Sequence, residues 1–267
     1  MLNDTRIREL VDFTYAKEVF PGTQIEGGVS YFLWDSTWDG NCAVVTIEEG
    51  KPTADPVTRE LNEFEILVRR NEALSILRKV LSPSSGEKFK SLESNISPIQ
   101  PFSIRTNFRG ASAPKDIANP VRLVGNGEDT WIDRSEVPRN VEWVDQWKVL
   151  IGRAYGVGSK PPQKVFNNPL VAEPGSACSE TYLVAGRFED EKTALMLSSY
   201  LQTRFVRFLV SLRKNTQDIY SERFSFVPDL TMTQKWDDLL LYKKYRLSPN
   251  EVNFIESMIR PMGLPDV

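Results

Sequence analysis

Histidine is absent from this chain of 267 residues. Histidine is the usual general base near neutral pH and the usual partner of a catalytic serine or cysteine, so its absence excludes Ser-His and Cys-His hydrolases. Cysteine is scarce, because Cys42 and Cys178 are the only two and lie far apart in the sequence. We expect both to be structural thiols, and the sequence predicts no zinc site.

Long apolar runs are missing as well. The run Val29–Trp34 is among the longest, whereas a membrane-crossing helix needs about 20 apolar residues. The first residues lack the basic-then-apolar pattern of a secretory signal, so we expect a cytoplasmic protein. A strong excess of one charge is also missing, since 33 basic and 36 acidic residues give a net charge of −3. A nucleic-acid partner would therefore need a locally basic surface.

The composition is that of an ordinary globular protein, with 40% hydrophobic and 26% charged residues. Apolar segments at 6–13, 29–34 and 43–47 predict strands, and turn-forming glycines at 27 and 28 precede the second of them. Charges and prolines at 48–56 are typical of a linker. We therefore divide the chain into a strand-rich part, 1–50, and a larger part, 51–267.

The larger part predicts a mixture of helices and short strands, which makes the chain α+β. The apolar spacing indicates helices at 57–81, 190–214 and 233–245, with the segment 190–214 as a long spine helix. A further helix begins at Ser248, where proline and glutamate follow as in a capping box. Strands are predicted at 102–108, 121–124, 130–133, 148–154 and 181–184.

Several familiar catalytic patterns are incomplete. The glycine pairs at 125–127 and 156–158 lack the third glycine of a phosphate-binding loop. The segments KPPQ at 160–163 and NNPL at 167–170 each hold half of an Asn-Pro-Pro-aromatic motif, and we interpret both as loops. A metal-dependent nuclease could be assembled from Asp190 or Asp229, but an acidic residue at 190 is better explained as a helix start.

Basic and amide side chains gather in two segments, at 102–110 and 148–164. Such side chains on strands or loops provide phosphate contacts and hydrogen bonds to base edges. The alternative interpretation is an ordinary solvated surface. The candidates for DNA contact are Arg105, Asn107, Arg109, Lys148, Arg153 and Lys160.

The segment EVFPGTQIEGGVSYFLWD at 18–35, preceded by LNDTRIRELVDF at 2–13, resembles a hairpin region of gamma-type, TaqI-like N6-adenine DNA methyltransferases. Later segments are similar to the target recognition region of fused Type IIG restriction-modification enzymes. They are PFSIRTNFRG at 101–110, KVLIGRAYG at 148–156, CSETYLVAGRF at 178–188, LQTRFVRFLVSLRKNTQ at 201–217, FSFVPDLTMTQKW at 224–236 and ESMIRPM at 256–262.

This resemblance implies a remnant of a methyltransferase β-hairpin followed by a DNA target recognition domain. In the family, the S-adenosylmethionine loop and the Asn-Pro-Pro-aromatic motif precede the hairpin. We therefore expect this chain to hold neither, and a missing methyltransferase or endonuclease part to bind S-adenosylmethionine. By resemblance Phe20 stacks on the flipped adenine, and its alternative role is a core phenylalanine.

The expected partner is double-stranded DNA, bound in a salt-sensitive way and without methylation by this chain alone. A second hypothesis is an interaction module whose helices 190–214 and 233–260 dock onto a methyltransferase subunit. A third is a complete nuclease that uses Asp190 or Asp229.

Overall fold

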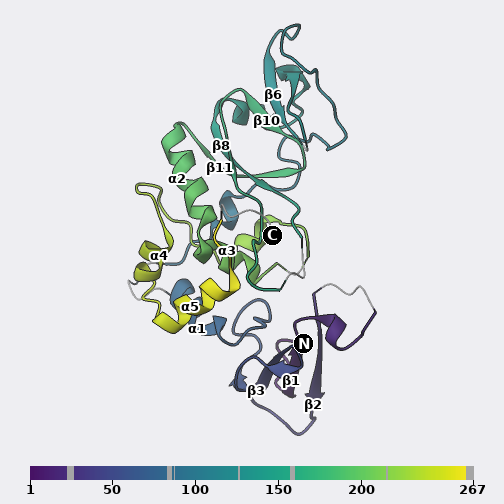
Figure 1. The fold of residues 1–267 in the computed structure, drawn as a ribbon, viewed down its shortest axis with the longest axis vertical. Coiled ribbons are helices and arrows are strands. Elements are labelled where there is room, and N and C mark those ends of the chain that lie inside the picture. The colour runs from purple at the N-terminus through teal and green to yellow at the C-terminus, as the bar shows by residue number, and fades with distance from the viewer. Residues whose placement is uncertain are drawn as a thin grey trace.

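The computed structural model describes residues 1–22, 27–82, 86, 88–125, 127–156, 160–214 and 216–262. The described part confirms an α+β fold, with three small β-sheets and five α-helices (Figure 1). None of the helices in this part combines the length and the apolar character needed to cross a membrane.

The first sheet has the strand order β2-β1-β3-β4, and a fifth strand, β5, pairs with β3. β1 runs antiparallel to β2 and parallel to β3. The three strands predicted in the first fifty residues are confirmed, while part of the predicted glycine-rich link, 23–26, lies outside the described residues. The strands are β1 (Ile7–Phe13), β2 (Val29–Trp34), β3 (Cys42–Glu48), β4 (Lys51–Pro52) and β5 (Val57–Arg59).

The predicted helix at 57–81 is wrong in its first half. Residues Val57–Arg59 form β5, and the helix α1 is confined to Ala73–Leu81. The apolar residues of this segment serve two cores, since Leu61 packs with the first sheet and Val68 packs with the helices. A buried Arg59 donates a hydrogen bond to the Val68 carbonyl and holds the intervening chain in a loop.

A central sheet of β8 (Trp147–Gly152), β9 (Leu170–Ala172) and β11 (Tyr182–Phe188) separates two cores. Side chains alternate along β8: Val149 and Ile151 join the helical core, whereas Leu150 joins the core of the third sheet. Burial on both faces explains the continuous apolar run of this strand.

The third sheet has the order β10-β6-β7 and lies beyond the central sheet in Figure 1. The predicted strands at 121–124 and 130–133 are confirmed, and so are those that became β8 and β11. The bounds are Pro120–Val124 for β6, Thr130–Asp133 for β7 and Ser176–Cys178 for β10.

The predicted strand at 102–108 is wrong. Its inside-outside alternation is present, because Phe102 and Ile104 are buried and Ser103 and Arg105 are exposed. The backbone nevertheless turns at Ser103, which has a φ of +57°, and pairs with no strand in the described part of the chain. Alternation alone therefore does not produce a β-ladder.

The predicted spine helix at 190–214 is two helices. α2 (Glu191–Gln202) ends at Thr203, whose backbone is extended with a ψ of 149°, and α3 (Arg204–Ser211) begins there. The Thr203 hydroxyl accepts a hydrogen bond from the Val206 amide, and so caps α3.

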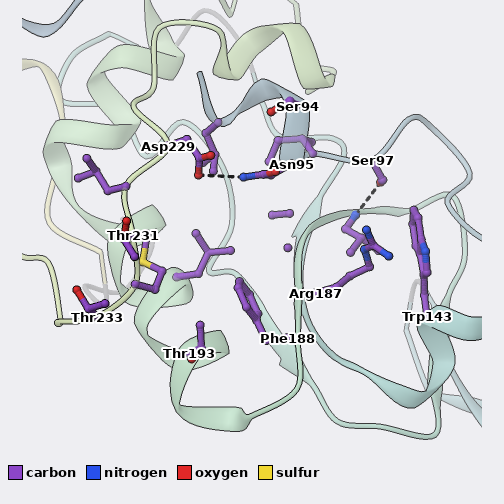
Figure 2. A pocket seen from close by; sticks show the side chains of 18 of the residues that line it. Ser94, Asn95, Ser97, Trp143, Arg187, Phe188, Thr193, Asp229, Thr231 and Thr233 are labelled. Atoms are coloured by element: carbon purple, nitrogen blue, oxygen red, sulfur yellow. Dashed lines mark hydrogen bonds between the residues drawn. The ribbon is translucent and has the colours of Figure 1, made fainter. Parts of the chain in front are cut away.

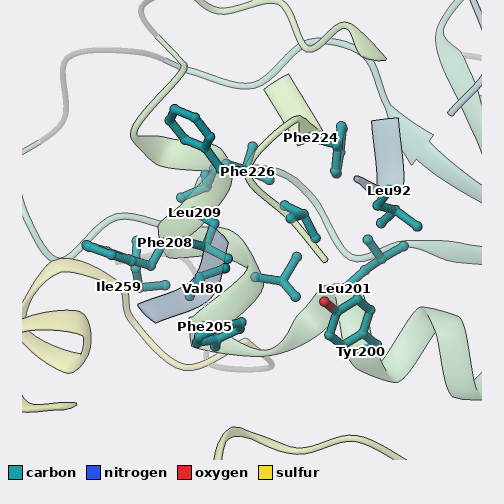
Figure 3. Packing of buried hydrophobic residues seen from close by; sticks show 14 of the residues in the cluster. Val80, Leu92, Tyr200, Leu201, Phe205, Phe208, Leu209, Phe224, Phe226 and Ile259 are labelled. Atoms are coloured by element: carbon teal, nitrogen blue, oxygen red, sulfur yellow. The ribbon is translucent and has the colours of Figure 1, made fainter. Parts of the chain in front are cut away.

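The helical core surrounds α3, where Phe205, Phe208 and Leu209 are fully buried (Figure 3). Residues distant in sequence, including Val80 of α1 and Ile259 near the C-terminal end, pack in the same cluster. The remaining helices are α4 (Asp238–Lys244) and α5 (Pro249–Met258). The capping box predicted for α5 is confirmed, with Ser248 and Glu251 bonding each other's backbone amides.

Candidate nucleic-acid interface

The loop at 100–109 is a basic segment whose charged side chains are exposed to solvent. The carboxylate of Glu180, two residues before β11, accepts hydrogen bonds from this loop and holds it in place. Its Oε1 accepts from the Thr106 amide at 3.1 Å, and its Oε2 accepts from the Gln100 side chain at 2.6 Å. These hydrogen bonds, led by the one from the Thr106 amide, lower the pKa of Glu180, so the loop is anchored by a carboxylate that stays ionised.

The outward side of this loop carries three of the predicted DNA contacts. Arg105, Asn107 and Arg109 are all exposed. The Arg109 guanidinium donates to the carbonyls of Thr106 and Phe108 at 2.6 and 2.9 Å, which holds its charge close to the loop. Within the described residues, the side chains of Arg105 and Asn107 make no hydrogen bond, and their donors face solvent.

Arg153, another of the predicted DNA contacts, lies close to this loop. It follows β8, and its amide donates to the Thr181 carbonyl at 2.8 Å. The Thr181 hydroxyl in turn lies 3.4 Å from that of Thr106. The guanidinium pairs weakly with Asp218, at 3.9 Å. We call loop 100–109 together with Arg153 the basic surface.

Lys148 does not belong to this surface, and the prediction that it contacts DNA is wrong. The residue is fully buried, and its Nζ donates to the carbonyls of Trp143, Val144 and Gln146 at 2.6–3.3 Å. Burial lowers the pKa of Lys148 to about 8. It closes the end of a 3-10 helix inside the protein and has no access to a phosphate.

Lys160 is exposed but lies against the first sheet. Its Nζ pairs with Glu49 at 2.6 Å and lies 6.0 Å from the Tyr15 ring. This pairing lowers the pKa of Glu49. The positive charge of Lys160 is therefore already paired with a carboxylate. This makes Lys160 a weaker candidate for a phosphate contact than Arg105.

Phe20 follows the 3-10 helix Ala16–Glu18 and has 47% of its surface exposed. The alternative interpretation as a core phenylalanine is therefore wrong. Its amide donates to the Ala16 carbonyl at 2.8 Å, which fixes the backbone beside the ring. Stacking on a flipped adenine stays a prediction for this residue.

A group of cations surrounds Tyr155, and no sequence pattern predicted that they lie together. Lys164 lies 5.6 Å from the ring, Arg260 donates to the phenol oxygen at 3.3 Å, and Lys214 donates to the Tyr155 carbonyl at 2.9 Å. Tyr155, at the centre of this group, is two residues beyond Arg153 in the chain. The three cations lie up to about a hundred positions from Tyr155 in the sequence, and no local pattern joins them.

The two aspartates of the nuclease hypothesis have other roles. Asp190 caps α2 by accepting from the Thr193 amide at 2.9 Å, and Asp229 pairs with Lys90 at 2.5 Å. In the part of the chain that the structure describes, no group of three or more histidine, cysteine, aspartate or glutamate side chains is arranged to hold a metal ion.

Comparison with known proteins adds no family to these observations. No protein-family model matches the chain, and no curated protein matches it. The similarity to adenine methyltransferases therefore stays a prediction that rests on the sequence motifs.

Proposed function

We propose that this chain is the sequence-reading part of a bacterial restriction-modification N6-adenine DNA methyltransferase, and that it binds duplex DNA through the basic surface. The observation that carries this proposal is the loop at 100–109. It presents Arg105 and Asn107 to solvent while Glu180 holds its backbone. Arginine and asparagine are the side chains that pair with guanine and adenine edges in the major groove.

The chemistry of methyl transfer belongs to another part of the enzyme in this proposal. A separate segment or subunit supplies S-adenosylmethionine and the catalytic motif, and the complex works in the cytoplasm. Phe20 is the side chain of this chain that lies nearest to that chemistry, stacking on the target adenine. The chain alone binds DNA without methylating it.

Fluorescence anisotropy with a labelled duplex tests DNA binding. We expect the wild-type chain to bind at low salt and to lose affinity steeply as salt rises, because cations displace counterions from phosphates. Arg105→Glu should weaken binding by about tenfold or more, as expected when a charged contact is reversed. Arg246→Glu, which changes an exposed arginine beyond α4, is the matched control and should bind normally.

Two outcomes would contradict the proposal. One is an absence of binding at low salt, and the other is binding that salt does not change. Asn107→Ala separates sequence discrimination from overall DNA affinity, since it removes amide hydrogen bonds without changing charge. We expect it to reduce discrimination between duplex sequences more than it reduces overall affinity.

The alternative of a subunit-docking module is favoured by β2. Four consecutive large side chains at its edge of the sheet are exposed, Tyr31, Phe32, Leu33 and Trp34, with exposed fractions of 45–60%. Apolar exposure of this extent on an edge strand marks an interaction surface. The predicted docking helix is less suitable, because most of α3 is buried.

Paired charge substitutions test the docking alternative. Tyr31→Lys with Leu33→Lys should abolish self-association or subunit capture in sedimentation velocity, and should leave duplex binding unchanged. If this variant lost duplex binding as fully as it lost association, one surface shared by DNA and the partner subunit would be favoured over two separate surfaces.

A further inference from the structure

A cavity of about 540 Å³ lies between β11, the start of α2 and the segment 229–233. Its walls combine polar side chains with buried apolar residues, among them Leu92, Ile96 and Leu197. This volume is in the range of sites that enclose small organic ligands. The cavity takes no part in the basic surface, so its chemistry needs a separate account.

A β-bulge shapes the wall that β11 contributes. The pairing with β8 shifts between Val184 and Gly186, and both residues line the cavity together with Ala185 between them. A Cβ atom on Gly186 would lie 2.6 Å from Leu197 and 2.9 Å from Phe188, so this position admits only glycine without rearrangement. Bulges of this kind often re-aim side chains beside functional sites.

One side of the cavity carries a stacked cation. The Arg187 guanidinium lies 4.2 Å from the centre of the Trp143 ring, and Trp143 is itself set edge-on against the buried Phe102 at 6.0 Å. Arg187 is exposed and makes no hydrogen bond or ion pair with any described residue. Its planar group is thus held in place while its N–H donors remain available, an arrangement suited to a phosphate or carboxylate.

The other side carries a fixed carboxylate. Asp229 accepts from the Asn95 side chain at 2.9 Å and pairs with Lys90 at 2.5 Å, and Figure 2 shows Asn95 and Asp229 across the cavity from Arg187 and Trp143. Each carboxylate oxygen has a second lone pair that can accept from an amine. Among the described residues that line the cavity, Asp229 and Arg187 carry the charges.

We propose that this cavity binds a nucleotide, with the base between the apolar walls, its exocyclic amine donating to Asp229 and its phosphate paired with Arg187. A fatty carboxylate would pair with Arg187 but would leave its apolar chain against the charged Asp229. A cation at one side of the cavity and a carboxylate at the other therefore favour the nucleotide. The nucleotide is either free in solution or unstacked from a bound strand. The first source is independent of DNA recognition, and the second rests on the proposed function.

Isothermal titration calorimetry on the full chain with AMP, adenosine and ribose 5-phosphate tests this site. We expect AMP to bind, adenosine to bind more weakly and ribose 5-phosphate not to bind. Arg187→Ala should lower AMP affinity about tenfold, the loss expected for a charged hydrogen bond, and should leave adenosine affinity unchanged. Arg246→Ala is the matched control.

A second variant blocks the cavity itself. Thr231 is an exposed residue of the wall, and Thr231→Trp should abolish binding of both AMP and adenosine with an unchanged melting temperature. The proposal is overturned if the wild-type chain shows no AMP binding at millimolar concentration. AMP binding that survives both Arg187→Ala and Thr231→Trp would overturn it equally.

A competition experiment distinguishes the two sources. If the nucleotide comes from a strand, a duplex with one unpaired adenine should bind more tightly than a fully paired duplex, and AMP should remove that difference. If the nucleotide is free in solution, AMP should bind without competing with either duplex. Arg105→Glu should weaken duplex binding and leave AMP binding intact, so failure of DNA recognition and failure of this site give different results.

Discussion

Lys148 shows how a single side chain can be reassigned by burial. It stands in a segment rich in cations and interleaved with tyrosine, yet its Nζ is satisfied by three carbonyl groups inside the protein. Desolvation lowers the pKa of this amine to about 8 from its usual value near 10.5. The folded state therefore binds its proton less readily than the unfolded state between these two values.

This difference predicts a pH dependence of stability. Because the unfolded chain binds more protons between pH 8 and 10.5, Lys148 destabilises the fold below pH 8, and that penalty disappears as pH rises through this window. The free energy of unfolding of the wild type should therefore rise relative to Lys148→Met by about 2–3 kcal/mol across it. Urea denaturation at pH 7.5, 9 and 10 measures this, and parallel curves for the two proteins would contradict it.

Gly28 is a position where the backbone and its surroundings require glycine. Its φ is +83°, and a Cβ atom there would collide with the Arg69 side chain and with the carbonyl oxygens of Phe13 and Thr14. We expect Gly28→Ala to destabilise the protein by about 2 kcal/mol or more, from backbone strain and this overlap together.

Gly22 provides the matched control for that change. Its φ of +87° is similar, but a Cβ atom would meet nothing within 4 Å. Gly22→Ala should therefore cost about 1 kcal/mol, the strain alone. Equal losses for the two variants in urea denaturation would show that crowding at Gly28 is unimportant.

The break between α2 and α3 divides a segment that was predicted as one helix. The apolar spacing continues through the break, but Thr203 adopts an extended backbone and caps α3. Asp238, at the start of α4, accepts from the amides of Arg204 and Phe205 at 3.1 and 2.9 Å. The side chains of Thr203 and Asp238 thus satisfy the first three amides of α3 and stabilise the new helix start.

Removing the capping hydroxyl should destabilise α3. We expect Thr203→Ala to lower the free energy of unfolding by about 1 kcal/mol, while Thr203→Ser keeps the hydroxyl and most of the stability. Chemical denaturation followed by circular dichroism compares the variants. A serine variant as unstable as the alanine variant would indicate that the methyl group, rather than the cap, is what matters.

The first sheet is joined to the segment before α1 by an ion pair in which the carboxylate is buried and the arginine is half-buried. Arg69, in the segment before α1, donates from Nε and Nη2 to the Asp12 carboxylate at 2.7 and 2.9 Å, and also to the Phe13 carbonyl. Asp12 is buried on β1, and burial raises the pKa of its carboxyl despite the nearby Arg69. The pair therefore fixes the position of the sheet while keeping a costly charge inside.

Arg69→Met should leave that carboxylate without its partner and destabilise the molecule by about 3 kcal/mol near pH 7. The pKa of Asp12 should then rise further above its unfolded value. A raised carboxyl pKa favours the protonated folded state, so the variant should recover stability relative to the wild type as pH falls from 7 toward 5. Calorimetric unfolding at both pH values tests this, and a deficit that is constant with pH would contradict it.

The sequence by itself determined the features that depend on near neighbours. The strands β1, β2, β3, β6 and β7, and the capping box of α5, follow from alternation and from residues within one turn. Alternation also gave the correct side-chain directions at 102–105, even though no strand forms there, but it failed at Phe108, which is exposed.

Only the tertiary structure decided which of the predicted site residues share a surface. It buried Lys148, paired Lys160 with Glu49 and joined Arg153 to the loop through Thr181. The group around Tyr155 and the cavity beside Arg187 are assembled from segments that lie more than a hundred residues apart. Such assemblies depend on how sheets and helices that are distant in sequence pack together. Local periodicity does not predict those contacts.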